Sequence, residues 1–143
     1  VLSMASTKKV LILDEPVLGF DAVMRKTFYD LLLESCQSRP KTVIVSTHLI
    51  DEMAAVAEKL IVIDKGRLLL YSEMNDIDEK AYTVTGPAEY VEPAVANLNV
   101  IGETKAGGFV SKFVFDKRIE GGPQDTVASL GLQDFFISLV GEE

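Results

Sequence analysis

Apolar and polar positions alternate in blocks along the first half of the chain. Lys9–Leu13 contains a short continuous apolar run, which suits a strand buried on both faces of a sheet. Thr42–Ser46 is a second such run and is rich in β-branched residues, which favour strands. Between the two strands, apolar residues recur at i, i+4, i+7 and i+8 and predict one face of a helix: Met24, Phe28, Leu31 and Leu32.

The residues around these segments predict where they begin and end. Asp21 is a good N-cap for the first helix, and Arg39-Pro40 ends that helix because a residue before proline avoids helical angles. Two strands, Leu60–Ile63 and Arg67–Tyr71, flank a turn sequence and predict a hairpin. A second helix follows Thr42–Ser46, on the spacing of Leu49, Met53, Val56 and Leu60. The order strand–helix–strand–helix–strand predicts an α/β fold with a parallel sheet.

After Ser72 the pattern changes, and we expect a small α+β appendage. The predicted division is residues 1–73 for the α/β part and residues 74–143 for the appendage. Its expected strands are Ala81–Thr85, Val100–Thr104 and Val110–Phe115. Its expected helices are Pro87–Leu98 and Leu130–Val140, and the polar segment Met74–Glu79 is expected to be a connector or one helical turn.

Composition narrows the classes of function. The chain has 143 residues, 48% of them hydrophobic, which is enough for a packed core. No apolar run approaches the roughly 18 residues of a membrane span, and Val1–Val10 does not resemble a signal peptide. The net charge of -8, without a basic patch, argues against a nucleic-acid partner. The single cysteine, Cys36, excludes an internal disulfide and is read as a small apolar residue.

Two adjacent carboxylates, Asp14 and Glu15, stand at the end of the first strand. Ligands bind at the carboxyl ends of the strands in open α/β sheets, so this is a candidate site. Adjacent residues on a strand face opposite ways, so the two side chains cannot do the same task. One can hold Mg²⁺ and the other can orient and deprotonate an attacking water. A solvated strand end without chemistry is the alternative.

His48 follows the second strand and is the only histidine of the chain. The carboxyl ends of parallel strands meet at one edge, which places its imidazole near the Asp-Glu pair, where it could bond to a terminal phosphate. Asp21 lies six residues beyond Glu15, at the head of the first helix. A helix-start histidine with satisfied hydrogen bonds is the plainer alternative for His48.

Three segments together resemble one family, the ABC ATPases. Leu11–Asp21 (L-I-L-D-E-P-V-L-G-F-D) is similar to their Walker B segment and D-loop. Ser46–Leu49, followed by Asp51-Glu52, is similar to their switch-histidine segment, and Leu60–Leu70 to the strand pair after it. Order and spacing match jointly over residues 1–72. The resemblance implies a partial P-loop NTPase parallel sheet with helices, followed by the α+β appendage.

The resemblance also implies roles for single residues and two cofactors, ATP and Mg²⁺. By it, Asp14 coordinates Mg²⁺, Glu15 is the general base and His48 is the switch histidine near the γ-phosphate. Asp21 is the D-loop aspartate that meets a partner subunit in the ATP-bound dimer. Val17 and Phe20 depart from the family, which usually has Thr or Ser and Leu at these positions.

The phosphate-binding loop G-x-x-x-x-G-K-[ST] does not occur in the chain, nor do the Q-loop and the signature. The family has all three upstream of the Walker B strand. We therefore expect the chain to be a fragment truncated at its N-terminus, with Val1–Ser6 as the tail of the preceding helix. Leu132–Gly141 is similar to the tail helix of exporter-type ABC ATPases.

The expected function is that of an ATP-hydrolysing subunit of an ABC transporter on the cytoplasmic face of a membrane. The implied partners are a transmembrane permease subunit, its only link to the membrane, and a second ATPase subunit in a homodimer. A regulatory binding module without a P-loop, and a soluble ABC ATPase that binds nucleic acid, remain as alternatives.

The missing central strand of such a sheet has its own consequence. In the family it lies between the strands that here are Thr42–Ser46 and Leu60–Asp64. Unpaired strand edges cannot be left buried. We expect the two strands either to pair directly or to exchange elements with a second copy, and we favour the homodimer.

Overall fold

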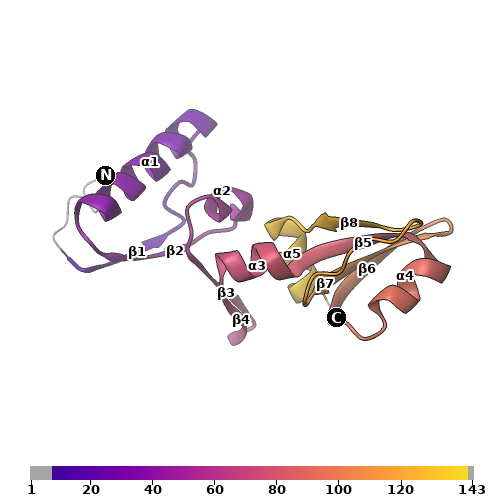
Figure 1. Cartoon of the computed structure of the whole chain (residues 1–143). Coiled ribbons are helices and arrows are strands. Elements are labelled where there is room, and N and C mark those ends of the chain that lie inside the picture. The colour runs from indigo at the N-terminus through magenta and orange to yellow at the C-terminus, as the bar shows by residue number, and fades with distance from the viewer. Residues whose placement is uncertain (1–7, 142–143) are drawn as a thin grey trace. The chain divides into compact units, whose positions relative to one another are not determined.

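A computed structural model describes residues 8–141, which fall into two compact units, Val1–Val56 and Ala57–Glu143 (Figure 1). The expected helix tail at Val1–Ser6 lies outside the described residues. The hairpin of residues 59–73 belongs to the second compact unit. The division at residue 73, which rests on the change of sequence pattern after Ser72, stays a prediction.

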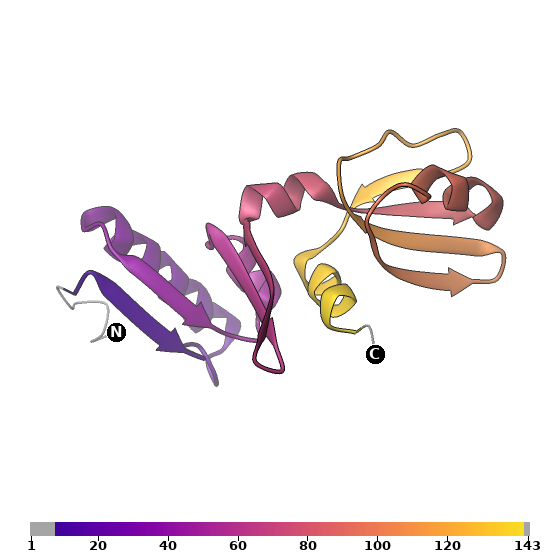
Figure 2. The same cartoon turned by 90° about the horizontal axis from the view of Figure 1, so that it is seen from below.

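The first unit is a two-stranded parallel sheet with one long helix. It contains β1 (Val10–Asp14), α1 (Ala22–Ser38), β2 (Thr42–Ser46) and the short α2 (Ile50–Ala54). β1 and β2 pair in register from Val10↔Thr42 to Asp14↔Ser46, which confirms the parallel pairing expected from the sequence. In Figure 2, α1 runs along one face of this pair. The strand ends that carry the candidate site therefore meet at the same edge.

Helix α1 begins and ends where its flanking residues predict. Asp21 has extended backbone angles and its carboxylate accepts a hydrogen bond of 2.8 Å from the Met24 amide, as an N-cap does. The helix ends at Ser38, just before Arg39-Pro40.

The buried face of α1 differs from the predicted one. It carries Phe28, Tyr29 and Leu32, which pack with Val17 in the core of this unit. Met24 and Leu31, expected on the core face, are 51% and 40% exposed. Val17, in the loop after β1, packs against Phe28, Tyr29 and Leu32. The row of α1 residues that contact the core, the α1 contact line, therefore includes Tyr29 instead of Leu31.

The opposite face of the β1–β2 pair is apolar and open within this unit. Val10 and Ile12 are 55% and 72% exposed, and Ile44 on β2 is 48% exposed. In the first unit β2 pairs with β1, and in the second unit β3 pairs with β4. The expected closure of the sheet, by direct pairing of Thr42–Ser46 with Leu60–Asp64 or by exchange with a second copy, stays a prediction.

The second unit opens with the predicted hairpin. β3 (Lys59–Asp64) and β4 (Arg67–Glu73) pair antiparallel around Lys65 and Gly66. Both turn residues have positive φ, 45° and 76°, as a two-residue type I′ turn requires. Leu60 was expected both as the last apolar position of the second helix and as the first residue of a strand. In the structure it pairs with Ser72 of β4 and belongs to the strand. The second helix is therefore shorter than predicted, and the connector after Glu73 forms the helix α3 (Met74–Lys80).

The remainder is a four-stranded antiparallel sheet with strand order β6-β7-β5-β8. Five elements of this part were predicted with small shifts: β5 (Ala81–Pro87), α4 (Ala88–Val95), β6 (Val100–Ala106), β7 (Phe109–Phe115) and α5 (Leu132–Val140). β8 (Thr126–Ser129), which precedes α5, was not predicted. The order resembles a ferredoxin-like βαββαβ sheet in which loop 116–125 replaces the second helix.

Helix α4 packs on one face of this sheet, where Val91 and Val95 join a buried cluster with Tyr82, Val84, Val110 and Val114. Helix α5 packs against β6, and its Phe135 meets Phe115 of β7 edge to face at 5.0 Å. The buried cluster and the Phe115–Phe135 ring pair both lie within residues 57–141, so this unit has a core of its own.

Leu32 and Leu31 offer a direct test of the α1 contact line. Leu32→Ala leaves a cavity beside Val17 and lowers the free energy of unfolding of the first unit by about 2–5 kcal/mol. Leu31→Ala, on the same helix but half-exposed, costs about 1 kcal/mol or less. Urea denaturation followed through the amide NMR signals of α1 measures both values. Equal losses for the two variants would contradict the observed contact line.

Candidate functional site

The candidate site lies where β1 and β2 end side by side. Asp14 is paired in register with Ser46, and the Ser46 hydroxyl donates a hydrogen bond to the Asp14 carboxylate. The Glu15 amide then donates to the Ser46 carbonyl at 2.9 Å, which extends the ladder by one bond. The pairing register therefore determines that the two carboxylates of β1 face the residues that end β2.

Glu15 leaves the strand with an unusual backbone. Its φ is 40°, in the left-handed region that is costly for a residue with a side chain. Its carboxylate faces the segment after β2 instead of continuing the alternation of the strand. Asp14 and Glu15 consequently have separate partners, as two different tasks require.

Glu15 holds His48 and Thr47 through both carboxylate oxygens. The His48 Nδ1 lies 2.8 Å from Glu15 Oε1, a separation that requires a proton between nitrogen and oxygen. The His48 amide donates to the same oxygen at 3.1 Å, and the Thr47 hydroxyl donates to Oε2 at 3.2 Å. The structure thus brings together the Glu15 and His48 that the sequence analysis paired.

These contacts change the acidity of the carboxyl group. The hydrogen bond from His48 is the main reason that the pKa of Glu15 lies below its ordinary value of 4.5. Partial burial acts in the opposite direction, and the Thr47 hydroxyl adds to the lowering. Glu15 is therefore ionised at neutral pH, as a group that accepts a proton must be.

The loop from Glu15 to Asp21 is held by two consecutive turns. The Leu18 amide donates to the Glu15 carbonyl at 3.1 Å and the Phe20 amide to the Val17 carbonyl at 3.0 Å. Gly19 has a φ of 81°, which the second turn needs and which glycine adopts without strain.

The two loop residues that differ from the family, Val17 and Phe20, both anchor the loop to the core. Val17 is 1% exposed and belongs to the core beneath α1. Phe20 packs against that core and meets Phe28 edge to face at 6.5 Å. An apolar side chain at each position therefore fixes the loop by burial.

Asp21 is exposed and its side chain is engaged as the cap of α1. Within residues 8–141, Asp21 makes no hydrogen bond or ion pair with Glu15 or His48, so the structure does not bring it into the same cluster. Its expected contact with a partner subunit stays a prediction.

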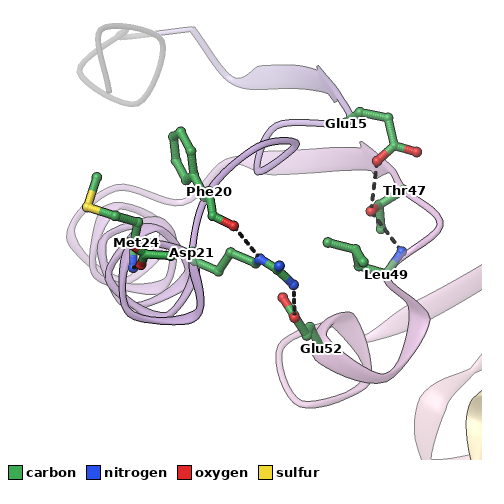
Figure 3. A network of polar contacts seen from close by, with 8 residues as sticks. Glu15, Phe20, Asp21, Met24, Thr47, Leu49 and Glu52 are labelled. Atoms are coloured by element: carbon green, nitrogen blue, oxygen red, sulfur yellow. Dashed lines mark hydrogen bonds and ion pairs between the residues drawn. The ribbon is translucent and has the colours of Figure 1, made fainter.

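Sequence reasoning missed Arg25, which joins the two site loops through contacts with Phe20 and Glu52, both labelled in Figure 3. Its Nε donates to the Phe20 carbonyl at 2.9 Å, and one terminal nitrogen pairs with Glu52 of α2 at 2.5 Å. Figure 3 also shows the Thr47 hydroxyl between the Glu15 carboxylate and the Leu49 amide. The only sign of this role in the sequence is the position of Arg25, four residues after the Asp21 cap. A charged residue at such a position is usually exposed to solvent, so the sequence alone did not single it out.

The donor set suits a hard cation with few protein ligands. No group of three or more His, Cys, Asp or Glu residues in the described part of the chain could hold a metal ion. Mg²⁺ in nucleotide sites takes one or two carboxylates, with waters and phosphates filling the rest of its shell. Asp14 and the adjacent Ser46 hydroxyl offer oxygen donors only, at an exposed strand end, which fits this mode.

No protein-family model matches the chain. Over 100 residues it is 31% identical to the energy-coupling factor transporter ATP-binding protein EcfA2 of Enterococcus faecalis, which covers 65% of this chain and 35% of the relative. Over 98 residues it is 29% identical to the aliphatic sulfonates import ATP-binding protein SsuB 2 of Rhizobium johnstonii, 68% of this chain and 36% of the relative. Over 67 residues it is 37% identical to the phospholipid-transporting ATPase ABCA3 of Rattus norvegicus, 47% of this chain and 4% of that protein.

A solved structure, an inward-facing conformation of a putative metal-chelate type ABC transporter, is also similar. It is 24% identical, with a TM-score of 0.44, and the match covers 74% of this chain and 39% of that chain. A likeness at this level is too weak to define function.

The first unit is thus an α/β unit with a two-stranded parallel sheet and an acidic strand end. The chain is homologous to the ATP-binding proteins of ABC transporters, which confirms the recognition made from its motifs. It spans about a third of the length of the EcfA2 and SsuB relatives.

The Glu15–His48 contact predicts a measurable shift in acidity. His48→Ala removes the main hydrogen bond, so the pKa of Glu15 rises toward 4.5. Carboxyl ¹³C NMR over a pH titration measures this value, and Lys26→Gln, on an exposed pair of α1, serves as control. An unchanged Glu15 pKa in the histidine variant would show that the contact is not formed in solution.

Proposed function

We propose that this chain carries the hydrolytic half of the ATP site in an ABC transporter ATPase subunit. The observation that carries the proposal is the Glu15–His48 contact at paired strand ends, in a chain homologous to ATP-binding proteins. ATP and Mg²⁺ are the cofactors that this site would take, and the phosphate-binding loop would come from a part outside this sequence.

In this proposal each residue has one task. The ionised Glu15 orients the attacking water and takes its proton. Asp14 would hold Mg²⁺, which supplies charge neutralisation at the β- and γ-phosphates. His48 positions Glu15 through Nδ1 and leaves its other ring nitrogen for the γ-phosphate. Asp21 sits at the surface, where a partner subunit could reach it.

The proposed partners are a transmembrane permease subunit and a second ATPase subunit in a homodimer, at the cytoplasmic face of a membrane. No helix in residues 8–141 is both long and apolar enough to cross a bilayer. The open face of β1–β2, with Ile12 72% exposed, supports cover by further protein.

The relatives do not agree on what is transported. Their names include the import of aliphatic sulfonates and the transport of phospholipids. The exporter-type direction rests on the Leu132–Gly141 resemblance alone and remains a proposal.

A regulatory module without ATP hydrolysis is the second candidate. The absence of G-x-x-x-x-G-K-[ST] from this sequence favours it, and the second unit has its own core to carry such a role. Sequencing the DNA upstream of Val1 separates the two. An in-frame P-loop and signature support the ATPase, whereas a stop codon just upstream supports the module.

The chain by itself should bind Mg-ATP only very weakly. Phosphate affinity in P-loop proteins comes largely from the loop amides and the lysine, which this sequence does not contain. Isothermal calorimetry with the purified chain measures the affinity. A dissociation constant in the micromolar range would contradict the assignment of this chain to the hydrolytic half alone.

Glu15→Gln tests the general base in an assembly that combines this chain with a P-loop. The amide keeps the shape but cannot accept the proton, so kcat falls by at least about 10²-fold while ATP affinity is unchanged. Glu34→Gln, on the exposed side of α1, is the matched control and keeps full activity. Turnover near the wild-type rate in the Glu15 variant would show that another group is the base.

A further inference from the structure

The Arg25 side chain connects three segments that otherwise have separate roles. It stands on α1, its Nε bonds to the carbonyl of Phe20 in the loop after β1, and its terminal nitrogen pairs with Glu52 on α2. Helix α2 begins two residues after His48. A single guanidinium therefore touches the loop that leads to Asp21 and the helix that follows the histidine.

The surroundings of this pair are sheltered. The side chains of Arg25 and Glu52 are 29% and 36% exposed, whereas the Lys26–Asp30 pair on the same helix is 76% and 60% exposed. Beneath it, the hydroxyl of Tyr29 and one oxygen of Glu52 are shielded from solvent, and neither has a hydrogen bond of standard geometry. Burial, and next the charge of Glu52, raise the pKa of Tyr29. The Glu52 charge thus acts in a partly dry environment, where ion pairs are stronger than at the surface.

We propose that Arg25 is a positioning residue that couples the 17–21 loop to the His48 segment, so that the two move as one body. The inference deepens the proposed function, on which its meaning for catalysis rests. Arg25 contacts neither Glu15 nor His48 among the described interactions, and it acts through Phe20 and Glu52. The planar guanidinium suits the task because it has donors in fixed directions for two acceptors at once, which a lysine lacks.

The coupling has a consequence for the proposed site. The 17–21 loop begins two residues after the general base and ends at Asp21, which a partner subunit could reach. Displacement of Asp21 by a partner would pull on the Phe20 carbonyl and, through Arg25, on Glu52 and α2. Assembly of two subunits would in this way adjust the position of His48 beside Glu15.

The test measures whether a substitution of Glu52 changes the environment of Phe20. Among the described residues, Glu52 makes no hydrogen bond with Phe20 and is joined to it only through Arg25. Glu52→Gln keeps the shape and removes the charge that orients Arg25. NMR on the whole chain then follows the Phe20 carbonyl ¹³C shift and the hydrogen exchange of the Leu18 and Phe20 amides. Lys26→Gln, which breaks the exposed pair on the same helix, is the matched control.

We expect exchange at Leu18 and Phe20 to accelerate about tenfold in Glu52→Gln and the Phe20 carbonyl shift to move, since a charge-assisted contact is lost. The β2 amides and the Lys26→Gln variant should show no change. Arg25→Lys should reproduce the loop effect. An unaltered Phe20 in Glu52→Gln overturns the coupling, and so does equal acceleration in β2, which would reveal a loss of overall stability. Neither result depends on ATP hydrolysis, so failure of the proposed function remains a separate outcome.

Discussion

The parallel pairing of β1 with β2 is the constraint on which the candidate site depends. Its register sets Asp14 opposite Ser46, and one more ladder bond, from the Glu15 amide to the Ser46 carbonyl, carries the alignment past the strand ends. A slip of one residue would turn both carboxylates to the other face of the sheet. The contacts of Glu15 with Thr47 and His48 follow from this alignment together with the positive φ at Glu15.

Apolar burial and polar contacts have different roles in holding the loop after β1. Val17 and Phe20 bind the loop to the α1 core through apolar contact. Arg25 then ties the Phe20 carbonyl to α2. Apolar burial has no preferred direction, so it keeps the loop close to the core, while the guanidinium bonds determine its orientation.

The first unit leaves an apolar face of its sheet open to solvent. Val10, Ile12 and Ile44 lie on one face of β1–β2, opposite α1, and all are about half exposed or more. The second unit differs, since Tyr82, Val84 and Val114 are fully buried among its own helices and strands. Apolar burial is therefore more complete in the second unit than in the first.

Much of this protein was readable from the sequence. The apolar runs, the Asp21 cap and the Arg39-Pro40 stop placed β1, α1 and β2 within about one residue, because these signals act locally along the backbone. The joint order of three motifs indicated the family. The common edge of the two parallel strands predicted that Glu15 and His48 lie close together. Tertiary structure decided the rest. The buried face of α1 includes Tyr29 instead of Leu31 because Val17, in the loop before the helix, folds back against it. β8 formed because β5 offered an edge, and Arg25 acquired contacts with acceptors five and 27 residues away. Such contacts depend on which surfaces meet after folding, and spacing along one chain does not encode them.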